Sequence, residues 1–183
     1  MELVLCLLFP VLVVVVIVVV WWISVSNNFK RKETKVYEGL SNIEVALEKR
    51  YDMLTKLRDA AKAYLTHETE VFSKVIELRK GMSVAELSAA DAAMTTYRDG
   101  LFAVAENYPD LRSSDVFVQL ERGIHDAEDH LQAARRLFNS NVSAYNQAII
   151  VFPSSIIANV EKRSQKTFYE VADHKRQDVE IRF

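Results

Sequence analysis

The first pattern along the chain is an apolar run from Leu3 to Ile23 in which no residue carries a charge. A helix of about 20 residues rises roughly 30 Å, which is the thickness of the hydrocarbon core of a bilayer. The run closes on Trp21 and Trp22, and tryptophan concentrates at membrane interfaces. Residues 1–26 are therefore predicted to be a transmembrane anchor. A cleaved signal peptide is the alternative, but it needs a basic start and a shorter apolar stretch.

Between Phe29 and Arg79 the apolar residues follow two rows with a seven-residue spacing, offset from each other by four. The first row is Val36, Ile43, Arg50, Leu57, Tyr64, Val71 and Leu78, and the second is Leu40, Leu47, Leu54, Ala61, Glu68 and Val75. Such rows line one face of an α-helix. They predict one long helix that ends near Arg79, with Gly81 as its C-terminal cap.

Three further helices are predicted downstream. Ser83 and Glu86 have the spacing of a capping box and open a helix that Pro109 ends. Its apolar stripe is Leu87, Ala90, Met94, Tyr97, Leu101, Val104 and Tyr108. Another helix starts near Ser114 and runs to Pro153. Its apolar stripe is Phe117, Leu120, Ile124, Ala127, Leu131, Ala134, Phe138, Asn141, Tyr145, Ala148 and Phe152. A short helix over 156–160 follows, and the alternation in 179–183 indicates either a strand or a partly ordered tail.

Together these patterns predict an all-α fold, in which an N-terminal transmembrane helix is followed by an elongated antiparallel three- to four-helix coiled-coil-like bundle. The expected divisions are the anchor at 1–26, the bundle at 27–165 and a C-terminal tail at 166–183. The predicted helix from Phe29 is much longer than its neighbours. Part of its stripe would then remain for another subunit to cover, so the length difference predicts a homo-oligomer.

Arg50 and Glu68 interrupt the apolar rows of the first predicted helix. One interpretation is that they are buried polar groups that fix the register or the partner, as single polar residues do in coiled coils. The other is stripe drift, because a straight helix slips by about 20° per heptad against a seven-residue repeat. If either residue is buried, it needs an opposite charge from another helix.

Three asparagines, Asn139, Asn141 and Asn146, lie along the predicted helix that ends at Pro153. They indicate either a polar seam between helices or subunits, or a solvated face with one tolerated core asparagine.

Charge and cysteine usage narrow the class of protein. The chain has 23 Lys and Arg against 25 Asp and Glu, well mixed, so nucleic-acid binding has no electrostatic support. The lone cysteine allows no disulfide framework and fits a reducing compartment. Lys30, Arg31, Lys32 and Lys35 follow the anchor, and positive residues stay on the cytoplasmic side. The N-terminus is therefore expected outside and the helical domain in the cytoplasm.

Candidate chemistry is sparse. Around His125 and His130 stand the acidic residues Glu121, Asp126, Glu128 and Asp129. Glu121 and Asp126 precede the two histidines at the four-residue spacing of metal ligands on a helix. The two pairs face different ways, and HExxH is missing, so a solvated acidic face is the preferred interpretation. A phosphate-binding loop and an activated nucleophile are also missing from the sequence. The prediction is a protein without catalytic residues, metal or cofactor.

The residue strings of the soluble part resemble the LemA family from about Asn27 to Phe183. The matching strings are IEVALEKRYDML at 43–54, Tyr64 with His67 and Glu68, YPDL at 108–111, ARRLFN at 134–139 with Tyr145 and Asn146, and FPS at 152–154 with Ile157 and Ala158. The family pattern has Pro-Asn where this chain has Thr55 and Lys56, so a straighter first helix is expected here. The resemblance implies a bacterial membrane-anchored helical bundle, and it brings no catalytic residues.

Two functions follow as hypotheses. The first is a non-enzymatic scaffold in the bacterial inner membrane that self-assembles through a cytoplasmic helical domain. The alternative is an adaptor that binds another membrane protein, such as a protease or envelope enzyme. LemA family members are often encoded near such proteins, which is an association rather than a mechanism.

Overall fold

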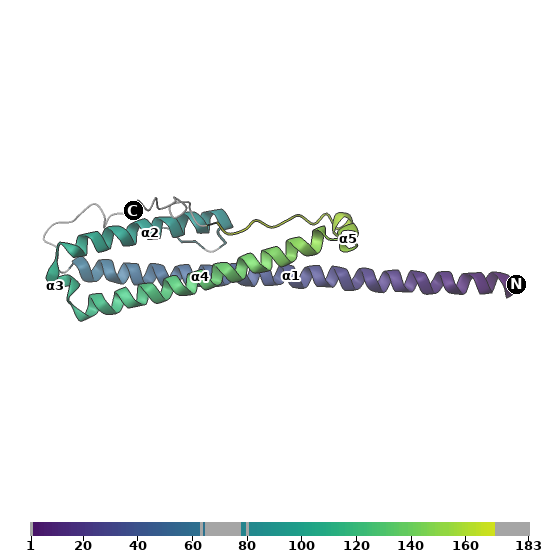
Figure 1. Ribbon diagram of the computed structural model, residues 1–183, viewed down its shortest axis with the longest axis horizontal. Helices are drawn as coiled ribbons and strands as arrows, with labels where there is room; N and C mark the ends of the chain where they lie inside the picture. The colour runs from purple at the N-terminus through teal and green to yellow at the C-terminus, as the bar shows by residue number, and fades with distance from the viewer. Residues whose placement is uncertain (1, 63, 65–77, 80, 171–183) are drawn as a thin grey trace, which may run out of the picture. The chain divides into compact units, whose positions relative to one another are not determined.

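The structure is a computed structural model, and it describes residues 2–62, 64, 78–79 and 81–170 of the chain. The described elements are α1 (Glu2–Lys62), α2 (Val84–Glu106), α3 (Pro109–Arg112), α4 (Asp115–Ile150) and α5 (Ser154–Val160), all of them helices (Figure 1). The predicted all-α fold is confirmed, as is the short helix after Pro153. The strand or tail expected at 179–183 lies outside the described residues.

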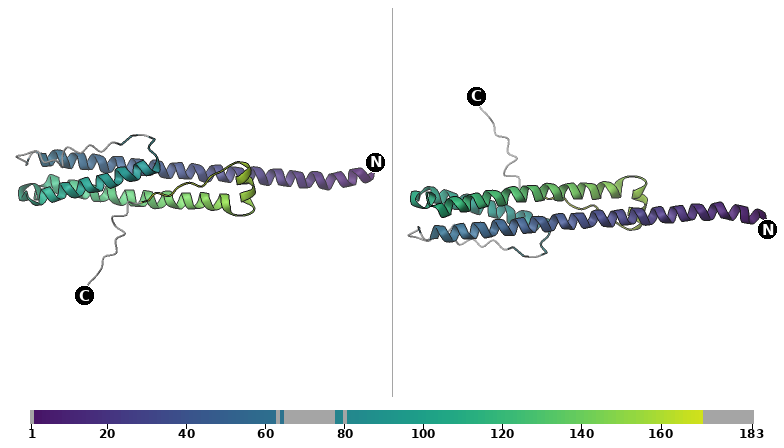
Figure 2. Two further views of the ribbon diagram at one scale, coloured as in Figure 1. Left: turned by 90° about the horizontal axis from the view of Figure 1, so that it is seen from above. Right: turned by 90° about the horizontal axis from the view of Figure 1, so that it is seen from below.

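The chain divides into two compact units. Unit 1 combines residues 1–38 with 140–167, and unit 2 combines residues 39–139 with 168–183. Both α1 and α4 contribute to each unit, because each helix continues across the division. Within each unit the two helices lie side by side, as the views in Figures 1 and 2 agree.

Helix α1 runs without interruption from the apolar run into the bundle. It passes through Ser24–Asn28, whose side chains compete for backbone hydrogen bonds, and through Thr55 and Lys56. A serine or asparagine costs less than about 0.7 kcal/mol in a helix interior. The full burial of Phe29 immediately afterwards offsets that cost. The apolar run and the first bundle helix are thus one element.

The predicted end of this first helix near Arg79 is wrong. Helix α1 stops at Lys62, and Leu78 and Arg79 are not helical. The amide of Tyr64 donates to the carbonyl of Ala61 at 3.0 Å, which tightens the chain into a turn. Tyr64 is also exposed, so the apolar row has drifted off the core there. Gly81 has a φ of +79° but precedes α2 instead of capping α1.

The capping box at the start of α2 is confirmed. The amide of Glu86 donates to Ser83 Oγ at 3.3 Å, and the amide of Ser83 donates to Glu86 Oε2 at 2.7 Å. Two amides that the helix cannot satisfy itself are therefore paired. The helix ends at Glu106, and Pro109 opens α3.

The core of unit 2 is built from the apolar stripes of α1, α2 and α4, with Leu111 of α3 added to them. Its buried residues include Ile43, Leu47, Leu54, Leu57, Leu87, Met94, Leu101, Leu111, Phe117, Ile124, Leu131 and Phe138. Gly123 allows α4 to approach α1 closely, because a Cβ there would lie 3.1 Å from Met53 Sδ.

In unit 1 the stripe of α4 departs from the predicted one. Val142 and Ile149 are buried, whereas Asn141 is only half-buried and Phe152 is 76% exposed. A strict seven-residue count loses phase with a helix of 3.6 residues per turn, which moves the core positions forward by one residue. The core also contains Phe29 and Val36 of α1 and Ile157 of α5.

The apolar run of α1 is the one described helix long and apolar enough to cross a membrane, judged by length and composition. Its side chains from Phe9 to Val20 are all exposed, and Trp21 and Trp22 near its end are half-buried. The chain therefore has an N-terminal helix compatible with a membrane anchor.

Candidate functional site

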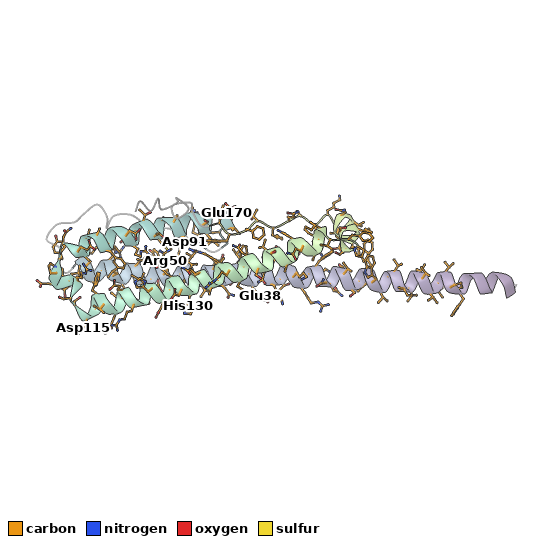
Figure 3. All side chains as sticks on the ribbon, viewed as in Figure 1. Glu38, Arg50, Asp91, Asp115, His130 and Glu170 are labelled. Atoms are coloured by element: carbon orange, nitrogen blue, oxygen red, sulfur yellow. The ribbon has the colours of Figure 1, made fainter. Side chains whose placement is uncertain are left out.

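Arg50 lies at the centre of unit 2, where α1, α2 and α4 meet, and only 2% of it is exposed. Its Nη1 donates to Asp91 Oδ1 at 2.6 Å, and its Nη2 donates to Thr95 Oγ1 at 3.0 Å and to Glu128 Oε1 at 2.9 Å. Figure 3 shows Arg50 and Asp91 side by side between α1 and α2. The interpretation as stripe drift is therefore excluded for Arg50.

Asp91 receives a second cation and a phenol on its other carboxylate oxygen. Arg135 of α4 donates to Asp91 Oδ2, and the Tyr169 hydroxyl donates to the same oxygen at 3.3 Å. The guanidinium of Arg135 also lies over the Tyr169 ring, 5.4 Å from its centroid. Asp91 is 4% exposed and Tyr169 is 3% exposed, so this carboxylate is sealed beneath the residues that it binds.

Glu128 of α4 joins the network through two arginines. Its Oε1 accepts hydrogen bonds from Arg50 and from Arg98 of α2, which also pairs with Asp99. The sequence interpretation placed Glu128 on a solvated acidic face, and for this residue that is wrong. The reason is that Arg50 and Arg98 reach it from the other two helices.

The buried charge network, which we define as Arg50, Asp91, Arg98, Glu128 and Arg135, brings three cations against two carboxylates. Because its members come from α1, α2 and α4, a shift of any one helix along its axis would separate a buried charge from its partner. Burial raises the pKa of Tyr169, so its hydroxyl remains a hydrogen-bond donor. This arrangement can fix the register of the three helices.

Two asparagines of α4 bind the backbone of the segment that follows α5. In unit 2, Asn139 donates to the Tyr169 carbonyl at 3.0 Å and accepts from the Tyr169 amide at 2.8 Å. In unit 1, Asn146 makes the same pair of bonds with Lys166, at 2.9 and 2.8 Å. Each asparagine side chain thus supplies the pair of hydrogen bonds that this non-helical backbone would otherwise need from a neighbouring strand.

The third asparagine has a different partner. Asn141 Nδ2 donates to the carbonyl oxygen of Lys35 on α1 at 2.8 Å. The asparagines accordingly bind elements of their own chain. Residues 166–170, which the sequence analysis assigned to the tail, include the buried Tyr169.

Unit 1 has an ionic cluster at the start of this same segment. Glu33 accepts from Lys166 at 2.8 Å and from Arg163 at 3.3 Å. The hydrogen bond from Lys166 holds the pKa of Glu33 below its ordinary value, and the Glu33 carboxylate raises the pKa of Lys166. Lys166 also lies over the rings of Tyr37 and Tyr145, and Arg163 lies over the ring of Phe29.

The remaining predicted residues are placed as follows. His125 and His130 are exposed on α4, and Figure 3 shows His130 on the helix surface. Within the described ranges, no group of three or more His, Cys, Asp or Glu side chains is arranged to hold a metal ion. Glu68 lies outside the described residues. Trp21 and Trp22 lie at the end of the apolar run, half-buried.

Of the buried charge network the sequence analysis proposed Arg50 alone; it missed Asp91, Arg98, Glu128 and Arg135, and also Tyr169. A signal for Asp91 was present, because it follows Leu87 by four residues and precedes Met94 by three, and both are stripe residues of α2. An acid on that face calls for a buried cation, which Arg50 supplies. Nothing in the sequence around Tyr169 marks it as core, because the segment is not helical and has no periodic pattern.

Comparison with known proteins places the fold and site in a family. The family model described as the LemA family matches residues 39–183. Protein LemA of Metamycoplasma hominis is 23% identical over 164 residues, which cover 87% of this chain and 75% of that protein. Magnetosome protein MamQ of Magnetospirillum gryphiswaldense is 30% identical over 74 residues, or 40% of this chain and 27% of that protein.

The family match includes all members of the buried charge network and both asparagines that bind the segment after α5. It covers most of the chain and agrees with the strings on which the resemblance rested. The chain belongs to the LemA family.

Proposed function

We propose that this protein is a non-enzymatic scaffold, anchored in a membrane, whose helical domain holds a partner protein beside the bilayer. The observation that carries the proposal is the continuity of α1 from the apolar run into the core of unit 1. A helical connection without a flexible linker fixes the domain at the membrane surface, where a long linker would let it drift.

The buried charge network supports a structural role for the domain interior. Its carboxylates are engaged by guanidinium groups of the same chain, and Asp91 is sealed from solvent. Such a network specifies one arrangement of helices, which a scaffold needs in order to present a constant surface.

We further propose that the anchor crosses the bacterial inner membrane with its N-terminus outside and the domain in the cytoplasm. The apolar run is followed on the domain side by Lys30, Arg31 and Lys35, which are all exposed to solvent. Positive residues of this kind are retained on the cytoplasmic side during insertion. Labelling an introduced cysteine at Lys35 with a membrane-impermeant maleimide in intact cells tests this, and labelling from outside would refute it.

The helix lengths bear on whether the partner is another copy of this chain or a different protein. From Phe29 to Lys62, α1 is nearly as long as α4 with its 36 residues. Across this range the apolar stripe of α1 is buried within one chain, from Phe29 to Ala61. The length difference that predicted self-assembly is therefore missing from the described residues. We propose the adaptor, with another membrane protein as its client, ahead of the self-assembling scaffold.

The experiment that separates the two is the mass of the full-length protein in detergent, measured by light scattering with the detergent contribution subtracted. The adaptor is expected to be a monomer or a small oligomer, and crosslinking in native membranes would then identify the client. A large, uniform assembly would overturn this order and make the self-assembling scaffold the better description.

A further inference from the structure

The turn between α4 and α5 displays a group of large apolar side chains that no described element covers. These are Ile150 (57% exposed), Val151 (56%), Phe152 (76%), Ile156 (49%) and Val160 (61%), and we call them the α4–α5 patch. Isolated apolar residues are normal on a protein surface. Five of them within eleven positions form a patch of the kind that a membrane or another protein covers.

The patch lies at the same height along α1 as the end of the apolar run. Asn141 binds the backbone of Lys35, and α4 continues from there toward the N-terminal end of α1 (Figure 1). Over about nine residues α4 rises roughly 14 Å, which brings Ile150 level with Ser26 on α1.

Contacts at the other end of α5 give the same height independently. The guanidinium of Arg163 lies 5.1 Å from the centroid of the Phe29 ring. Burial raises the pKa of Glu161, but hydrogen bonds from Ser26 and Arg163 outweigh it and hold that pKa below its ordinary value. The chain just after α5 is thus tied to α1 between Ser26 and Phe29, within unit 1.

This height corresponds to the headgroup layer if the apolar run fills the hydrocarbon core. Ser26 is about three residues beyond Ile23, or roughly 5 Å along the helix. The headgroup region on each side of the core is about 5–7 Å deep. The patch would therefore meet the boundary between headgroups and acyl chains, the depth at which interfacial apolar side chains settle.

The charges around the patch suit an anionic lipid surface. Lys30 and Arg31 on α1 and Lys162 after α5 are exposed at this same end of unit 1. Basic residues beside an inserted apolar group add attraction to anionic headgroups. Soluble protein partners need not lie at this depth, whereas lipid is always present there.

We propose that the α4–α5 patch inserts into the lipid interface beside the anchor, so that unit 1 contacts the membrane at two places. This inference rests on the proposed anchoring of α1. Its ligand class is the anionic phospholipid bilayer itself. Two attachments would hold unit 1 against the membrane and prevent it from rotating about the anchor axis.

The test uses the full-length protein in vesicles of phosphatidylcholine and phosphatidylglycerol, with Cys6→Ser as background. An environment-sensitive fluorophore is attached to Phe152→Cys or, as the control, to Glu38→Cys. Glu38 is exposed on α1 and lies roughly 22 Å beyond Ile23. Quenching is measured with doxyl-labelled lipid and with aqueous iodide. The two tryptophans of the chain are Trp21 and Trp22, so intrinsic fluorescence reports on the anchor in the same sample.

The expected result is that doxyl lipid quenches most of the emission at position 152 and little at position 38, while iodide does the reverse. If the tryptophans are quenched by lipid but position 152 is quenched by iodide, the patch inference is overturned and the anchor stands. If position 152 is shielded from both quenchers, protein covers the patch and the inference also fails. If lipid quenches neither the tryptophans nor position 152, the proposed anchoring itself is wrong.

Discussion

Removing the carboxylate of Asp91 is the sharpest test of the buried charge network. The change Asp91→Ala leaves Arg50, which is 2% exposed, with Glu128 as its one remaining carboxylate, and leaves Arg135 with none in the network. Breaking a buried ion pair by deleting one partner costs about 3–5 kcal/mol, since the remaining charge stays desolvated. We expect a loss of that size in the free energy of unfolding.

The assay is thermal unfolding of the full-length protein in detergent, followed by far-UV circular dichroism. For a domain of this size 1 kcal/mol shifts Tm by about 2–4 °C, so Asp91→Ala should lower Tm by about 10 °C. The matched control is Arg112→Met. It removes the 3.9 Å pair with Glu106, whose two side chains are 63% and 68% exposed, and an exposed pair contributes less than about 1 kcal/mol.

A double replacement separates the loss of pairing from the loss of packing. Arg50→Met with Asp91→Leu removes both charges, and apolar substitution of a buried pair is often close to neutral. The double variant should therefore be more stable than the sum of its single variants predicts, by at least about 1 kcal/mol. Arg50→Glu, which adds a third carboxylate, should be worse than either single change. The reasoning fails if Asp91→Ala melts with Arg112→Met, or if the two replacements are additive.

Three further predictions concern other parts of the chain. Asn146→Ala should expose the Lys166 amide to rapid hydrogen exchange while Tm falls by only a few degrees. Unchanged protection of that amide would contradict the hydrogen bond from Lys166 to Asn146. Ser83→Ala should cost about 1 kcal/mol in urea unfolding, because the Glu86 amide loses the Ser83 hydroxyl as its acceptor, whereas Ser140→Ala on α4 should cost little. Because the folded-state pKa of Glu33 is lowered, its stabilisation is present above the unfolded pKa and is lost as pH falls through the folded pKa. Urea unfolding at pH 7 and at pH 3.5 should then show a smaller loss for Glu33→Gln than for the wild type, by less than about 1 kcal/mol, and equal losses would remove Glu33 from the account.

Much of the fold was predictable from local patterns. The capping box at Ser83 and the breaks at Pro109 and Pro153 depend on neighbouring residues along one helix, and all appear as expected. The core stripe of α2 also appears from Leu87 to Leu101, after which Ala105 is buried in place of Val104. The first stripe includes Arg50 but left burial and stripe drift open as alternatives, and the structure shows burial. What failed was the distance over which a seven-residue count stays in phase, which misplaced Asn141 and Phe152 and carried α1 too far.

The site was less predictable because its partners come from distant parts of the chain. Asp91 and Glu128 lie 41 and 78 residues beyond Arg50 along the chain and meet it only when three helices pack. The sequence indicated that a buried Arg50 needs an acid, but it could not choose among the many acids of the chain. The pairing of Asn139 and Asn146 with backbone groups was equally hidden, because a backbone has no residue type to recognise.

The unbroken passage of α1 through Ser24–Asn28 fixes the rotation of the core of unit 1 about the helix axis relative to the proposed membrane span. Successive residues of an α-helix advance by 100°, so the side of the span that lies under Phe29 is fixed by counting turns. Counting back by seven and eleven residues places Trp22 and Val18 on that side. Inserting one residue in the passage would rotate unit 1 by 100° about the helix axis while lengthening the helix by only about 1.5 Å. A membrane helix that packs on one side of the span would thereby also determine the direction, around the α1 axis, in which the core of unit 1 faces.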